Sequence, residues 1–169
     1  MKTYQLFEQM SPALADEIFT YLQKERTPVY KSVVQGLAQQ RRLRPVFVER
    51  KPRAERYRWL QAALGRKVSD ALAAHLLQAW LLGAQQAMLC DFLDSVGVKH
   101  DADGTVENLP ESPPKEELGK AVNQLLEKYP DETVTVYLHA FHDMDSEASW
   151  PPLGELLQED QRLRLGSQS

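Results

Sequence analysis

The sequence predicts an all-α protein: one compact domain over residues 1–169, with six or seven helices around one long central helix. Three observations support this fold class. Apolar residues recur three and four positions apart along most of the chain. Ser11-Pro12 and Thr27-Pro28 each precede such a stretch, and this pairing is typical of helix starts. The run from Ser69 to Gly97 is apolar on almost every side, as a buried central helix would be.

Composition agrees with an ordinary globular protein. The chain has 169 residues, of which 43% are hydrophobic, and this is enough to build a substantial core. Cys90 is the single cysteine, so no intramolecular disulfide can form, as expected in a reducing compartment. The first residues lack the apolar stretch of a signal peptide, and the most apolar window, 72–93, contains polar side chains. We therefore expect a cytoplasmic protein with no membrane partner.

The first half of the chain predicts three helices and a connector. Ser11 caps a helix over 11–26, and Thr27 begins a second helix that ends near residue 42. Prolines at both ends of the stretch LRPVFVERKP predict an extended, basic connector over about 43–52. A third helix follows from residue 53, with Gly65 as its stop.

The central helix is predicted from Ser69 to just before Gly97, and we expect any bend in it near Gly83. An acidic, proline-rich loop over about 98–113 separates it from an amphipathic helix that ends near Tyr129.

The segment DETVTVYLHAFH has two readings. Its alternating β-branched residues suit a strand, whereas Val134, Tyr137, Leu138 and Phe141 have helical spacing. The helical pattern covers more residues, so we predict a helix from Asp131 to about His142. Another helix should start at Trp150-Pro151, before a frayed tail over about 162–169.

Charge is divided unevenly along the chain. Residues 1–90 carry 14 Lys and Arg against 7 Asp and Glu, whereas residues 91–169 carry 6 against 17. This polarity can steer a charged partner, or it can let the two halves of one fold attract each other.

A metal site is one candidate function. His139 and His142 share a helix face, Asp143 and Asp145 offer oxygen ligands, and His75 could supply a third imidazole to zinc or iron. The plainer interpretation is that both histidines occupy the last turn of a helix, where positive charge is favourable. No other cofactor is expected.

The loop sequence HDADGTVENLP partly resembles a calcium-binding loop. Asp101, Asp103 and Gly104 match, but Lys99 and Pro110 stand where the first and last carboxylate ligands are required. A turn at Asp103-Gly104 fits the sequence better.

Residues 41–67 form a basic segment with ten Lys and Arg against two Glu. Phosphate binding needs such a cluster, and Tyr57 and Trp59 could add stacking on bases. The candidate nucleic-acid or anion-binding residues are Arg41, Arg42, Arg44, Arg50, Lys51, Arg53, Arg56 and Arg58. The alternative is a solvated face, or one that pairs with the acidic half of the chain.

The leading functional hypothesis is a protein-interaction module that meets its partner through the basic connector or the acidic loop. Nucleic-acid binding through residues 41–67 is the second hypothesis, and a metal enzyme with histidine ligands is the third. The sequence contains no phosphate-binding glycine loop and no nucleophile elbow, and no spacing in it selects a catalytic triad, so enzymatic activity has little support.

Overall fold

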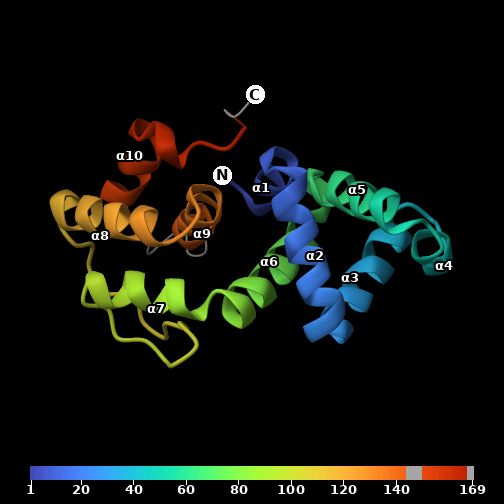
Figure 1. The fold of residues 1–169 in the computed structure, drawn as a ribbon, viewed down its shortest axis with the longest axis horizontal. Coiled ribbons are helices and arrows are strands. Elements are labelled where there is room, and N and C mark those ends of the chain that lie inside the picture. Colours follow the sequence, from blue (N-terminus) through green and yellow to red (C-terminus); the bar gives the residue numbers. More distant parts are fainter. Residues whose placement is uncertain (144–149, 167–169) are drawn as a thin grey trace. The chain divides into compact units, whose positions relative to one another are not determined.

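The computed structural model describes residues 1–143 and 150–166, and within them it is all-α, as predicted. The α-helices are α1 (Thr3–Gln9), α2 (Pro12–Glu25), α3 (Thr27–Gln40), α4 (Pro45–Glu49), α5 (Arg53–Leu64), α6 (Asp70–Ala84), α7 (Gln86–Ser95), α8 (Lys115–Lys128), α9 (Asp131–Asp143) and α10 (Pro151–Glu159) (Figure 1). Two 3₁₀ helices, η1 (Lys67–Ser69) and η2 (Gln161–Leu163), complete the described secondary structure.

The described residues hold ten α-helices where six or seven were predicted. Three differences account for the change: α1 forms at the N-terminus, α4 forms within the predicted connector, and the predicted central helix is two helices, α6 and α7.

The prediction of one continuous helix over 69–96 is wrong. Gln85 leaves the helical conformation between α6 and α7, two residues after Gly83, where we expected a bend. The side-chain amide of Gln86 donates to the Leu82 carbonyl, which the backbone N–H of Gln86 would occupy in a continuous helix. Buried apolar residues recur three and four positions apart in both α6 and α7. The apolar periodicity of the sequence therefore does not reveal the break between them.

The prediction of an extended connector over 43–52 is also wrong in its centre. Pro45 lies at the start of α4, where the missing N–H of proline costs nothing, and Pro52 follows its end. One helical turn therefore fits between the two prolines.

Contacts divide the chain into two compact units. The N-terminal unit is Lys2–Trp80, and the C-terminal unit is Leu81–Ser169 with Met1. The boundary falls within α6, between Trp80 and Leu81. The prediction of a single domain stays a prediction.

The N-terminal unit is built around α5, which packs against α1, α2, α3 and α4. The Ser11 hydroxyl caps α2 by accepting from the Leu14 N–H at 3.1 Å, as predicted from the sequence. An aromatic row joins three helices in the core: the rings of Phe7 and Phe19 stack at 6.2 Å, and those of Phe19 and Tyr57 lie 5.3 Å apart.

The C-terminal unit packs α8 against α7, α9 and α10. Its aromatic cluster places Phe92 edge-on to Tyr137 and Phe141, and the Phe141 ring lies 5.2 Å from that of Trp150. The helix predicted over 131–142 is confirmed as α9. The Thr135 hydroxyl donates to the Asp131 carbonyl, so this β-branched residue pairs its polar group within the helix.

The acidic loop is confirmed as non-helical chain, but the prediction of a frayed tail over about 162–169 is wrong at its start. Asp160 caps η2 through the Arg162 N–H, and Leu163 is fully buried. Residues 167–169 lie outside the described part of the chain. Among the helices that are described, none combines the length and the apolar character that a membrane crossing requires.

Candidate interaction surface

The centre of the basic segment is a single turn whose apolar face points to solvent. Leu43, Val46 and Phe47 lie three and four positions apart and are 39%, 37% and 58% exposed. Val48 points the other way and is fully buried. Helices normally bury their apolar stripe, so this arrangement is the inverse of the usual one.

Basic side chains surround these three apolar residues. We use the name α4 surface for Arg42, Leu43, Arg44, Val46, Phe47, Arg50 and Lys51. Within the described structure, the side chains of its four basic residues make no hydrogen bond or ion pair; Arg42, Arg44 and Arg50 are exposed and Lys51 is half-buried. All of these residues belong to the N-terminal unit.

The turn that leads into the α4 surface is unusual at Arg42. The N–H of Arg42 donates to the Gln39 carbonyl and that of Leu43 to the Ala38 carbonyl, which is the Schellman arrangement at a helix end. Glycine normally occupies the left-handed position of this motif, but here Arg42 does so with φ 55°. The chain thus accepts backbone strain and keeps a cation beside Leu43.

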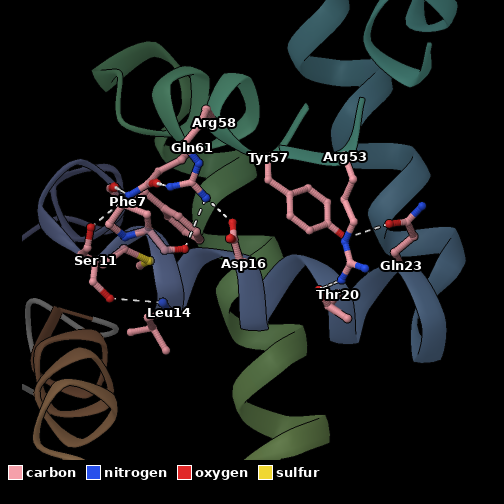
Figure 2. Close-up of polar contacts among 12 residues, drawn as sticks. Phe7, Ser11, Leu14, Asp16, Thr20, Gln23, Arg53, Tyr57, Arg58 and Gln61 are labelled. Atoms are coloured by element: carbon pink, nitrogen blue, oxygen red, sulfur yellow. Dashed lines mark hydrogen bonds and ion pairs between the residues drawn. The ribbon is translucent and has the colours of Figure 1, made fainter. Parts of the chain in front are cut away.

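The remaining predicted basic residues are engaged within the N-terminal unit. Arg53 donates to the Thr20 hydroxyl at 2.6 Å, and Arg58 pairs with Asp16 and donates to the Pro12 carbonyl. Figure 2 shows both side chains reaching from α5 toward α2. Their charges help to hold two helices together.

The aromatic residues suggested for base stacking are also engaged. Tyr57 is 2% exposed, and its hydroxyl donates to the Gln23 side chain. The guanidinium carbon of Arg41 lies 5.4 Å from the centre of the Trp59 ring, in a cation–π contact that covers part of that ring.

Arg56 holds α4 against the rest of the unit. One guanidinium nitrogen, Nη1, donates to the Glu49 and Lys51 carbonyls, both at 3.4 Å. Beneath α4, the Arg56 Nε and Tyr30 Oη atoms are buried and have no hydrogen-bond partner. Burial raises the pKa of the Tyr30 hydroxyl, and the Arg56 charge opposes that rise. Together with buried Val48, these contacts position the turn.

The three histidines of the metal hypothesis occupy different surroundings. His139 on α9 is buried, and its Nε2 atom donates to the Leu163 carbonyl at 3.1 Å. Burial lowers the pKa values of His139 and His142. His142 lies against Gly154 of α10, whereas His75 is exposed on the part of α6 that belongs to the N-terminal unit.

A metal centre gains no support from these positions. Within residues 1–143 and 150–166, no three His, Cys, Asp or Glu side chains gather as metal ligands. Asp145 lies outside the described residues. The Nδ1 atoms of His139 and His142 are buried without a hydrogen-bond partner.

The acidic loop is anchored at both of its ends. Gly104, with φ 91°, forms the predicted turn, and an added Cβ would come within 2.6 Å of the Leu89 Cβ. His100 contacts Asp94 Oδ1 at 2.7 Å and the Asp101 carbonyl at 2.6 Å, and these acceptors raise its pKa. The Trp150 Nε1 donates to the Pro110 carbonyl at 3.0 Å. The loop is thus packed on its own unit, whereas the α4 surface faces solvent.

Comparison with protein-family models, with curated proteins and with solved structures gives no match to this chain.

Sequence reasoning identified the basic residues of the α4 surface but missed its apolar ones. Leu43, Val46 and Phe47 fall in the stretch predicted as an extended connector over about 43–52, although their spacing is helical and Pro45 suits a helix start. That spacing was the available signal. It could not show which side of the turn faces solvent.

Proposed function

We propose that this chain is a protein-interaction module and that the α4 surface binds an acidic segment of a partner protein that also carries apolar side chains. The exposure of Leu43, Val46 and Phe47 beside four unpaired basic residues is the observation that supports this proposal. Large apolar side chains gathered on a surface are typical of binding sites.

Charge complementarity selects the kind of partner. The basic segment 41–67 holds ten Lys and Arg against Glu49 and Glu55. The rest of the N-terminal unit is close to neutral, so the positive field of this unit comes from that segment. An acidic partner would be steered to it, and the apolar side chains would supply affinity after contact.

Nucleic acid fits the same surface less well. Tyr57 is buried, Trp59 is partly covered by Arg41, and only Phe47 offers an open ring within the basic segment. Leu43 and Val46 have no counterpart in phosphate recognition. The apolar part of the surface therefore favours a protein segment.

Fluorescence anisotropy tests the proposal with a labelled 10-residue peptide of Glu and Asp interspersed with Leu and Phe. We expect binding on the order of micromolar, weakened about tenfold by Phe47→Ser through loss of the apolar anchor. The double variant Arg44→Gln/Arg50→Gln should weaken binding and reduce its dependence on salt. Lys120→Gln, which removes an exposed cation of the C-terminal unit, is the matched control. It should change neither the affinity for the peptide nor the salt dependence of binding.

Two results would contradict the proposal. One is tighter binding of single-stranded or duplex oligonucleotides than of the acidic peptide, which would support the nucleic-acid alternative. The other is acidic-peptide binding that Phe47→Ser leaves unchanged.

A further inference from the structure

We infer that the bound acidic segment contacts a second cluster, formed by Arg66, Lys67 and Val68 of the N-terminal unit, so that one extended partner chain engages two anchoring points. We call these three residues the η1 cluster. The inference rests on the proposed function and specifies the length and pattern of the partner segment.

The η1 cluster repeats the chemistry of the α4 surface. Val68 is 69% exposed, more than Leu43, Val46 or Phe47, and these four are the exposed large apolar residues of the described chain. Arg66 and Lys67 are exposed beside it, and their side chains make no hydrogen bond or ion pair in the described structure. One apolar side chain beside two unpaired cations is again complementary to a partner segment that carries both acidic and apolar side chains.

The two clusters are tied to the same helix end. Gln40, the last residue of α3, donates from Nε2 to the Val68 carbonyl at 3.2 Å and accepts from the Ser69 hydroxyl at 2.9 Å. Ser69 is buried. Two residues after Gln40, the chain turns at Arg42 into the α4 surface. The end of α3 therefore holds the η1 cluster and leads directly into the α4 surface.

The single residue between Gln40 and the α4 surface, Arg41, is positively charged as well. Arg41 directly follows Gln40 and lies over the Trp59 ring. A partner chain that contacts both clusters would thus meet a protein segment in which Arg41, Arg42 and Arg44 are consecutive or nearly consecutive cations. Linking two weak contacts in one chain raises affinity because the second contact forms at high effective concentration.

A peptide-length series tests the inference. The 10-residue acidic peptide is compared with a 20-residue peptide that continues the acidic and apolar pattern, and with a 20-residue peptide whose extension is Gly and Ser. For the unaltered protein we expect the patterned extension to strengthen binding about tenfold and the Gly-Ser extension to add nothing.

Variants separate the two clusters. Val68→Ser should abolish the gain from the patterned extension and leave binding of the short peptide unchanged, whereas Phe47→Ser should weaken binding of both peptides. Both residues are exposed, so the fold should persist, which circular dichroism checks. Lys120→Gln again serves as control.

The outcomes distinguish failure of the inference from failure of the proposed function. If the short peptide does not bind the unaltered protein, the proposed function fails. If it binds but the patterned extension adds nothing, or the gain survives Val68→Ser, the second anchoring point is wrong. A dimer that forms at the peptide-binding concentrations and is lost in Val68→Ser would instead identify the occupant as the acidic half of a second copy, and would overturn a separate partner.

Discussion

At the scale of single residues, the same side-chain type serves opposite purposes within one basic segment. Arg53, Arg56 and Arg58 bond to neighbouring helices or to the end of α4, whereas Arg44 and Arg50 face solvent. These arginines are alike in sequence, and helix packing decides which of them remain free to bind. Arg42 adds a third case, since it occupies a strained backbone position that favours glycine.

Replacing Arg42 should separate stability from binding. Arg42→Gly relieves the positive φ of 55° and should raise the free energy of unfolding by about 1 kcal/mol. It also removes one cation of the α4 surface, so affinity for the acidic peptide should fall severalfold. Urea denaturation and anisotropy measure the two effects.

Arg42→Gln is the matched control, because it removes the charge and keeps the strained backbone. We expect it to weaken binding as much as Arg42→Gly without the gain in stability. A glycine variant that unfolds more easily than the unaltered protein would show that the Arg42 side chain stabilises the turn.

At the scale of elements, two short helices, α4 and η2, were not predicted from the local sequence pattern. Each is held in place by contacts with another helix. α4 turns its apolar stripe outward because Val48 and the contacts of Arg56 hold its other side. η2 is held against α9 through Leu163, which is buried and accepts a hydrogen bond from His139. In both cases contacts with another helix, α5 for α4 and α9 for η2, stabilise one turn of helix that would not persist alone.

The attachment of η2 to α9 should depend on pH through His139. Burial lowers the pKa of this imidazole below the value of about 6.5 that it has in the unfolded chain. Its contribution to stability is therefore fully present above about pH 6.5 and is lost as the pH falls below it, because the unfolded chain then binds more protons. Urea denaturation between pH 7 and pH 5 should show this loss.

His139→Gln should make the loss of stability in that pH range smaller. A glutamine amide can still donate to the Leu163 carbonyl but does not titrate. Part of the slope should remain, since the pKa of His142 is also lowered by burial. An unchanged slope in the glutamine variant would mean that His139 does not carry the effect.

At the scale of the whole molecule, two compact units of opposite charge share one helix. The division falls between Trp80 and Leu81 inside α6, and the positive balance of the first half contrasts with the negative balance of the second. Unfolding either unit would remove part of the packing that stabilises α6. This shared helix is a reason to expect cooperation between the units.

We therefore expect the two units to unfold in one transition. Trp59 and Trp80 belong to the N-terminal unit and Trp150 to the C-terminal unit, so tryptophan fluorescence can report on each. In Trp150→Phe, the remaining tryptophans, Trp59 and Trp80, report on the N-terminal unit. In Trp59→Phe/Trp80→Phe, the remaining Trp150 reports on the C-terminal unit. Each variant's fluorescence midpoint in urea should coincide with its midpoint by far-ultraviolet circular dichroism; separate midpoints would contradict the prediction of a single domain.

The sequence by itself determined the all-α class, most helix boundaries and the location of the basic segment. These features depend on local properties, namely helical spacing, the Ser11 cap, proline at helix starts and the count of charges. They can be read without knowing what lies nearby in space, and the choice of helix over strand for residues 131–142 was correct for this reason.

Only the tertiary structure decided which residues face solvent. Whether Phe47 is covered, whether Arg58 is paired and whether Leu163 is buried all depend on helices that are distant in sequence. The break at Gln85 was missed for the same kind of reason, because apolar periodicity continues on both sides of it. The spacing of apolar residues indicates which face of a segment can be buried. The helices that pack against that segment decide which of its side chains remain exposed to a partner.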